Sequence, residues 1–423
     1  MRFIKSKTFL TGLLVAAFVL TGVGPAGSIS KPDIANAAAE YAAGNNPNET
    51  VSDSTPTPAP TSTPAPAAST PAPALTLSDA QQVEIARKAA VNIPLTDQTN
   101  AEANALYDKF KQSAASSNDV AANKAYSDEE LIKELPGFKN GYKEANGVRL
   151  HYVEGGEGEP LFLLPGWPVT WYSFREMMPE LAKNYHVYVV EYRGMGSSDK
   201  PQSGYDKKTM ATDIYELAKA LGYKSINIAG HDIGATIAYA YAANFPQATK
   251  KVVLMDASHP NENFLKIPIL PPSGVYDESN PERAKFYWWF AVNTIPGLSE
   301  QMLQGKELDL VYNWIYDYMG YTKDALSKKE REVYLAAYSQ PDALRAGNEW
   351  YKTFSDDIET LKTYKPLTVS ALGIAGVSGY SMLEQFLNEH APNSKTVKLE
   401  KTGHWIMVEN PQAAIKLFNE FFQ

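Results

Sequence analysis

Cysteine is absent from the 423-residue sequence, and its absence excludes several kinds of chemistry. Disulfide bonds, thiolate metal sites, cysteine nucleophiles and a lipid-modified lipoprotein start all require a cysteine side chain. A surplus of positive charge is also absent, because 39 lysines and arginines stand against 48 aspartates and glutamates, for a net charge of -9. Nucleic acid and anionic membrane surfaces would be repelled by that average field, so we expect a small uncharged organic molecule as the partner.

The first residues have the pattern of an export signal. Three basic side chains within the first seven positions precede an apolar stretch over about residues 9–23, and small residues follow up to Ala37. We expect cleavage after Ala37, which makes residues 1–37 a signal peptide and the protein secreted or associated with the cell envelope. An uncleaved anchor is the alternative, but the apolar stretch is shorter than the ~20 residues of a spanning helix. After cleavage we expect no stable membrane insertion.

Composition divides the remaining chain into three parts. Residues 38–77 are rich in threonine, proline and alanine, which predicts a disordered linker because such a segment cannot bury a core. Residues 78–136 contain apolar side chains at near-helical spacing, which predicts a helical extension. From residue 137 to residue 423 short apolar runs alternate with amphipathic segments. This alternation is typical of an α/β domain with a mostly parallel central sheet flanked by helices.

The alternation is interrupted once, over about residues 259–365, where aromatic residues are frequent and no strand pattern is visible. An insertion at that point would lie at the carboxyl ends of the strands, where open α/β sheets bind their ligands. We therefore predict an inserted helical lid. The strand candidates begin at Val148, Glu159, Tyr185, Lys224, Lys250, Leu367 and Ser394.

The most informative motif is the pentad GHDIG over residues 230–234, between the strand candidate KSINIA and the helix candidate ATIAYAYAANF. Gly230 and Gly234 leave room for the close backbone approach of a sharp strand-to-helix turn, which points the central side chain into the crevice. Serine usually occupies that place, whereas here it is Asp232. An ionised aspartate needs no activating base, and its attack on an electrophilic carbon leaves an ester that water must hydrolyse. An ordinary turn is the alternative interpretation.

Hydrolysis of such an ester requires a base, and six histidines compete for the role. Only His404 lies in a loop between the last strand candidate and the final helix, where it would face the same crevice as Asp232. Asp256 ends the strand VVLMDAS and is the predicted acid that orients His404, although an aspartate at a strand end can also be a simple turn residue. The loop after LFLLPG supplies backbone amides, so we predict an oxyanion hole formed by the amides of Trp167 and Ile233.

These motifs together resemble one branch of a known family. The segments PGWPVTWYSFREMMPELA, YRGMGSSDKP, GHDIGA, VVLMDA and TGHW are similar to those of the epoxide hydrolases and haloalkane dehalogenases of the α/β-hydrolase fold. The resemblance covers residues 137–423 and implies a covalent alkyl-enzyme mechanism, carried here by Asp232, His404 and Asp256. It implies neither a metal ion nor an organic cofactor.

Departures from the family pattern narrow the activity that the resemblance implies. Pro165 stands where the family usually has the histidine of His-Gly-x-Pro. Dehalogenases have a tryptophan after the nucleophile and an asparagine in the oxyanion loop, whereas this chain has Ile233 and Pro168. Fluoroacetate-type relatives have an arginine after the nucleophile, which Ile233 cannot replace. We therefore expect opening of epoxides to vicinal diols, with haloalkane or haloacid dehalogenation, or a catalytically silent exported protein, as alternatives.

Epoxide opening also needs a proton donor for the ring oxygen. The stretch NEWYKTF resembles the family's lid segment that carries a tyrosine donor, which maps onto Tyr351. A neutral phenol suits this task. The alternative is that Tyr351 is only a packing residue, because the chain has 25 tyrosines. Trp289 falls at a lid position that the family often fills with histidine, and we predict that Trp289, Trp405 and Pro168 line the substrate pocket.

Overall fold

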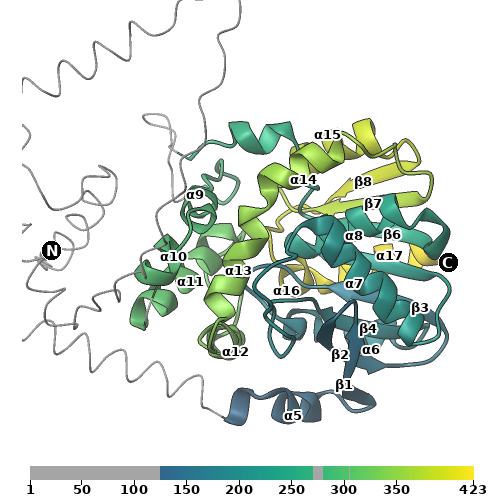
Figure 1. The fold of residues 1–423 in the computed structure, drawn as a ribbon, viewed down its shortest axis with the longest axis horizontal. Helices are drawn as coiled ribbons and strands as arrows, with labels where there is room; N and C mark the ends of the chain where they lie inside the picture. The colour runs from purple at the N-terminus through teal and green to yellow at the C-terminus, as the bar shows by residue number, and fades with distance from the viewer. Residues whose placement is uncertain (1–123, 270–279, 304) are drawn as a thin grey trace, which may run out of the picture. The chain divides into compact units, whose positions relative to one another are not determined.

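The computed structural model describes residues 124–269, 280–303 and 305–423 (Figure 1). The predicted signal peptide and linker, and the part of the predicted helical extension before residue 124, lie outside the described residues and stay predictions. In the described part, no helix is both long and apolar enough to cross a membrane. The described chain begins with three short helical turns, η1 (Lys124–Tyr126), α5 (Asp128–Leu131) and η2 (Ile132–Glu134).

One eight-stranded sheet forms the centre of the described structure, with the strand order β1-β2-β4-β3-β5-β6-β7-β8. β2 pairs antiparallel with β1 and β4, and every other neighbouring pair is parallel. This arrangement confirms the predicted α/β fold class. The strands are β1 (Phe138–Ala145), β2 (Val148–Gly155), β3 (Glu159–Leu164), β4 (Tyr185–Glu191), β5 (Ile226–His231), β6 (Thr249–Met255), β7 (Ser370–Ala375) and β8 (Ser394–Lys398).

The edge strand β1 is the one element of this sheet that the apolar pattern did not predict. Its sequence, FKNGYKEA, is largely polar, because the strand lies at an edge and most of its side chains are exposed or half-buried. The signal that could have revealed it is the turn that follows. Asn146 and Gly147 both have positive φ, 50° and 77°, and Asn-Gly is the preferred pair for a two-residue β-hairpin turn.

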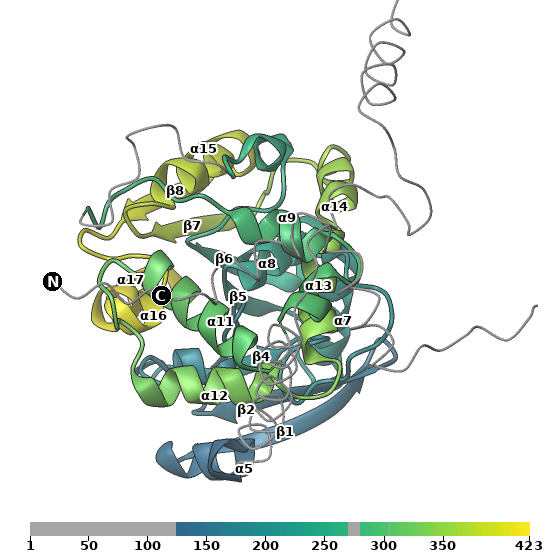
Figure 2. The ribbon, with the colours of Figure 1, turned by 90° about the vertical axis from the view of Figure 1, so that its left-hand side faces the viewer.

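Helices cover both faces of the sheet (Figure 2). α7 (Lys207–Ala220) and α8 (Ile233–Asn244) pack against each other on one face, and α6 (Met178–Leu181) packs with α17 (Pro411–Phe422) on the other. α8 is rich in alanine and buried along nearly its whole length, because its small side chains let it lie close to β3, β5 and β6. α15 (Tyr380–His390) packs on β7 and β8, and the short α16 (Ile406–Glu409) precedes α17.

A helical insertion follows β6 and precedes β7. Its described elements are η5 (Glu262–Lys266), α9 (Trp288–Thr294), α10 (Leu298–Met302), α11 (Lys306–Met319), α12 (Lys328–Tyr338), α13 (Ala343–Lys352) and α14 (Phe354–Leu361). The insertion is attached to the loops at the carboxyl ends of the strands. The hydroxyls of Tyr316 and Tyr338 donate to the carbonyl oxygens of Pro168 and Val169, which follow β3. The insertion therefore lies where α/β sheets bind ligands.

The turn from β5 to α8 brings three backbone segments into close contact. A Cβ on Gly230 would lie 2.0 Å from the carbonyl oxygen of Gly234, and a Cβ on Gly234 would lie 2.1 Å from that of Leu164. Between the two glycines Asp232 has φ 52° and ψ -121°, a backbone conformation that a residue with a side chain adopts only under strong constraint. The amide of Asp232 is also fixed, since it donates to the carbonyl oxygen of Met255 at 3.1 Å.

We expect that Gly230→Ala lowers the free energy of unfolding by about 2 kcal/mol or more, because the backbone around the turn must move to admit the methyl group. Urea denaturation measures the change. Gly147→Ala is the matched control, since Gly147 also lies in a turn but nothing lies within 4 Å of an added Cβ. Its effect should reflect only its positive φ, about 1 kcal/mol. Equal losses from the two substitutions would contradict the proposed crowding.

Candidate active site

Asp232 lies at the tip of the turn, and its two carboxylate oxygens have different surroundings. Oδ1 accepts a hydrogen bond from the backbone amide of Trp167 at 2.8 Å. Oδ2 lies 3.5 Å from Nε2 of His404. Gly166 permits this approach, because a Cβ there would lie 2.5 Å from Cβ of Asp232. One oxygen is therefore held by the loop after β3 while the other faces the imidazole.

The imidazole of His404 lies between two carboxylates. Its Nδ1 is 2.6 Å from Oδ2 of Asp256, which follows β6. The second oxygen of Asp256 accepts a hydrogen bond at 2.8 Å from the amide of Gly376, just after β7. With Asp256 in that position, Nδ1 carries the hydrogen and Nε2 is turned toward Asp232. The structure thus brings together the three side chains that the sequence predicted as nucleophile, base and orienting acid.

The loop that carries His404 is fixed from several directions. The His404 amide donates to the carbonyl oxygen of Met319 at 3.0 Å, and its carbonyl oxygen accepts from Nε2 of His231 at 2.8 Å. The Glu409 carboxylate accepts from the amides of Gly403 and Trp405 on either side. The Met319 and His231 contacts come from α11 and β5, far away in the sequence, whereas Glu409 in α16 is a neighbour in the chain.

A cavity of about 50 Å³ opens beside these groups. This exceeds the roughly 10–15 Å³ that one water molecule needs. Asp232, Asp256 and His404 line it, and in the described part of the chain neither lysine nor arginine does. Besides the polar residues Thr236 and Ser258, its lining is aromatic and aliphatic: Trp167, Ile233, Ala257, Phe264, Ile267, Tyr287, Trp289, Phe290, Ile315, Met319, Tyr351, Phe354, Met382 and Trp405. Such a wall suits an uncharged organic molecule and excludes water from around the carboxylate.

Comparison with known proteins identifies the fold family. The family model for the alpha/beta hydrolase fold matches residues 159–411. The soluble epoxide hydrolase of Corynebacterium sp. (strain C12) is 31% identical over 284 residues, which cover 66% of this chain and 94% of that protein. The chain belongs to the α/β-hydrolase fold family. This hydrolase therefore shares its architecture with enzymes that open epoxides.

Solved structures are similar to the hydrolase over nearly their whole length. The epoxide hydrolase CorEH has a TM-score of 0.57 and 29% identity, covering 67% of this chain and 98% of that one. Cfl2 from Burkholderia cenocepacia has a TM-score of 0.60 and 29% identity, covering 70% of this chain and 98% of that one. These similarities support an enzyme of the epoxide hydrolase type.

Of the residues predicted to line the pocket of the hydrolase, some line the observed cavity and one does not. Trp289, Trp405 and the predicted donor Tyr351 line the cavity. Pro168 does not belong to its described lining. Its carbonyl oxygen is instead bound by the Tyr316 hydroxyl at 2.8 Å. This contact joins the loop after β3 to α11, and the predicted place of Pro168 in the wall of the substrate pocket stays a prediction.

The predicted oxyanion hole has one amide already in contact with Asp232. This amide belongs to Trp167, as described above. The second predicted donor, Ile233, is the first residue of α8, where amide groups lack partners within the helix. Pro165, which replaces the usual family histidine, accepts a hydrogen bond from the Tyr192 hydroxyl through its carbonyl oxygen at 3.0 Å. The loop after β3 is therefore connected to the carboxyl end of β4 by Tyr192, although it has no histidine at position 165.

Some residues with an evident part in the site of the hydrolase were missed by sequence reasoning. Tyr287 lines the cavity, in the same aromatic stretch as Trp289. His231 binds the His404 loop, and its position beside the nucleophile is the signal that could have marked it. Burial is the main reason that the pKa of His231 is lowered to about 3, so its ring is neutral and its Nε2 can serve as a simple hydrogen-bond donor. Glu409 left no signal in the sequence.

The two neighbouring charges perturb His404 strongly. Burial alone would lower its pKa, but the hydrogen bonds and charges of Asp232 and Asp256 raise it to about 10. For the Asp232 carboxylate burial acts in the opposite direction and would raise the pKa. The hydrogen bond and charge of His404 outweigh burial, so the pKa of Asp232 is lowered. In the hydrolase without substrate, His404 is therefore an imidazolium between two carboxylates. Loss of the Asp232 charge would remove one of the two groups that hold the proton.

We expect this proton to make the stability of the hydrolase depend on pH. Because the pKa of His404 is raised in the folded state, its contribution is complete below the unfolded pKa of about 6.5 and is lost as pH rises toward about 10. The free energy of unfolding should fall across this range, by up to about 1.4 kcal/mol per pH unit. Urea denaturation of wild type and His404→Gln measures the difference, and His390→Gln, at the end of α15, is the control. A slope that His404→Gln leaves unchanged would contradict the assignment.

Proposed function

We propose that this hydrolase opens epoxides to vicinal diols through a covalent ester on Asp232. The observation that carries the proposal is the asymmetry of the Asp232 carboxylate, whose Oδ1 is bound by the Trp167 amide while Oδ2 faces His404 in an apolar cavity. An oxygen that is already held can become the carbonyl oxygen of an ester. The other oxygen is then the nucleophile.

In the first step Oδ2 attacks a ring carbon, the carbon–oxygen bond of the epoxide breaks, and the ring oxygen receives a proton. Tyr351 is the proposed donor. Its side chain is 1% exposed and lines the cavity. Burial, followed by the charge of Asp232, raises its pKa well above the ordinary value, so the phenol is neutral before reaction. A neutral phenol can donate to an oxygen that gains negative charge in the transition state.

Ester formation prepares His404 for the second step. The ester has no charge, so the pKa of His404 falls and its proton can pass to the phenolate of Tyr351. The neutral imidazole, still oriented by Asp256, then takes a proton from a water molecule as the water attacks the ester carbonyl carbon. The amides of Trp167 and Ile233 stabilise the oxygen that becomes negative. Collapse releases the diol and restores the Asp232 carboxylate and the His404 imidazolium.

The alternatives are less well supported by the cavity. At the two positions where dehalogenases place the tryptophan and asparagine donors for a departing halide, this chain has Ile233 and Pro168, whose side chains have no donor. A haloacid would bring a carboxylate into a cavity whose described lining has neither lysine nor arginine. A catalytically silent protein would have no need for a buried imidazole between two carboxylates, an arrangement that strongly shifts the pKa of His404.

His404→Gln should stop the reaction at the ester, because water is no longer activated. We expect mass spectrometry of this variant, incubated with a panel of epoxides and alkyl halides, to find an adduct on the peptide that contains Asp232. An epoxide adds its whole mass, whereas an alkyl halide adds only its alkyl group, so the mass identifies the electrophile. Asp232→Asn is the control and should carry no adduct. Adducts from halides alone would favour a dehalogenase, and the absence of any adduct would favour a silent protein.

Tyr351→Phe should lower kcat for epoxide opening about 100-fold or more, because it removes the proton donor but keeps the ring. Tyr312→Phe is a closely matched control. Both phenol rings pack edge-on against Trp167 with centroids 5.4 Å apart, and both side chains are 1% exposed. Tyr312 does not belong to the described cavity lining. Steady-state kinetics should therefore show little change for Tyr312→Phe, and similar losses in both variants would assign Tyr351 a packing role.

A further inference from the structure

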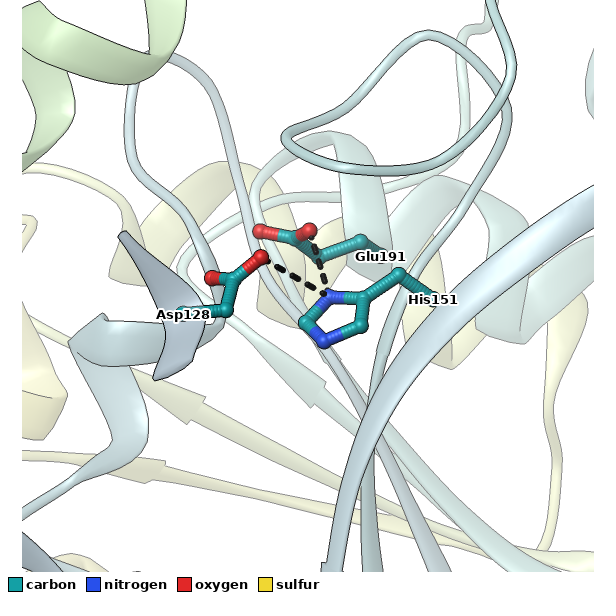
Figure 3. Close-up of side chains that lie close together, drawn as sticks. All are labelled: Asp128, His151 and Glu191. Atoms are coloured by element: carbon teal, nitrogen blue, oxygen red, sulfur yellow. Dashed lines mark hydrogen bonds and ion pairs between the residues drawn. The ribbon is translucent and has the colours of Figure 1, made fainter. Parts of the chain in front are cut away.

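A second group of ionisable side chains lies apart from the Asp232 site. Asp128 in α5, His151 in β2 and Glu191 at the end of β4 point toward one another (Figure 3). Nδ1 of His151 is 2.9 Å from Oε2 of Glu191 and 3.8 Å from Oδ2 of Asp128. The side chains of His151, Glu191 and Asp128 are 0%, 1% and 13% exposed. The mechanism proposed above uses none of them.

The orientation of His151 is set by a fourth residue. Its Nε2 lies 3.1 Å from Oδ1 of Asn140 in β1. An amide oxygen can only accept, so Nε2 carries the hydrogen and Nδ1 of a neutral ring would present a lone pair to two carboxylates. A cation must then lie among these three groups, either a proton on Nδ1 or a metal ion. Histidines that bind metals are held in the same way, with the other ring nitrogen donating to an oxygen.

The charges of this group favour an ion of more than one positive charge. In the described part of the chain, neither Asp128 nor Glu191 forms an ion pair with a lysine or arginine. Lys200 is near, but its ammonium donates to the carbonyl oxygens of Gly196 and Ser198. A protonated His151 would therefore balance only one of the two carboxylates at contact distance, and the other would depend on the more distant charge of Lys200.

We propose that Asp128, His151 and Glu191 bind a divalent transition-metal ion, for which zinc is the best match. One imidazole and two carboxylates are ligands that zinc accepts, at about 2.0–2.2 Å, which places ligand atoms roughly 3.4 Å apart around a tetrahedral ion. The three ligand atoms here lie within 4.8 Å of one another, so small side-chain shifts would complete that geometry.

The surroundings provide both support and access for the ion. The Asp128 carboxylate accepts hydrogen bonds from the Trp171 indole at 2.6 Å and from the Ser197 hydroxyl, and the Ser197 amide donates to Glu191 at 2.9 Å. Asp128 and Glu191 also line a polar cavity of about 520 Å³, through which an ion and a water ligand can enter. A bound ion would join α5 to two strands of the sheet and so stabilise the fold without taking part in hydrolysis.

The test uses the untagged full chain after treatment with a chelator, because a polyhistidine tag would itself bind zinc. Isothermal titration with zinc chloride should show one ion bound per chain, and Tm should rise in its presence. Asp128→Asn and His151→Gln should each weaken binding at least about tenfold and reduce the rise in Tm. Asp128→Asn preserves the shape of a partly exposed side chain, so we expect this variant to fold, which circular dichroism checks.

His186→Gln is the matched control. His186 pairs with a single glutamate, Nε2 to Oε2 of Glu154 at 3.0 Å, and lacks a second carboxylate. This variant should bind zinc as the wild type does. Absence of binding to the wild type would overturn the proposal and leave the proton as the cation of the group. Binding that is equal in wild type, Asp128→Asn and His151→Gln would overturn it as well. Neither readout depends on epoxide hydrolysis, so the outcome is independent of the function proposed above.

Discussion

A single imidazole held between two buried carboxylates is the interaction on which the candidate active site depends. Each carboxylate would be unfavourable in an apolar cavity without a positive partner, and His404 supplies one positive charge to both. The two carboxylates differ in exposure, because the Asp232 side chain is 18% exposed and that of Asp256 only 2%. In the proposed mechanism, ester formation at Asp232 would remove the negative charge on one side of the imidazole only. The remaining pair, His404 and Asp256, keeps its geometry while its proton becomes easier to move.

The chain fixes this arrangement by means of backbone contacts from distant segments. Asp232 depends on two glycines that let β5, α8 and the loop after β3 approach closely. His404 depends on Met319 in the insertion, on His231 beside the nucleophile and on the Glu409 carboxylate. The sheet and the insertion thus both contribute to the position of one ring. A change in the packing of either would be transmitted to the imidazole, because few of its contacts are local in sequence.

The sequence predicted those parts of the structure that have a local physical signal. Buried parallel strands appear as apolar runs, and the pentad around Asp232 is visible because the turn requires glycine at both ends. His404 and Asp256 could be chosen because the ends of parallel strands meet at one edge of a sheet. The polar edge strand β1 was not predicted, because few of its side chains are buried. The contact of Pro168 with Tyr316 could not be predicted, because it joins segments far apart in the chain, and so does the meeting of Asp128, His151 and Glu191.

The sheet and the helical insertion contribute different residues to the cavity, and this affects how the sequence can change in evolution. The carboxylates and the imidazole are attached to loops that follow β5, β6 and β8, whereas Tyr287, Trp289, Phe290 and Phe354 belong to the insertion. Substitutions among these aromatic side chains would reshape the room available to a molecule without disturbing the hydrogen bonds of the reacting groups. Most of the aromatic wall and the group Asp232, His404 and Asp256 are thereby encoded in separate stretches of the gene, so that the wall can change while this group is retained, and Tyr351 is the proposed reacting residue that lies in the insertion.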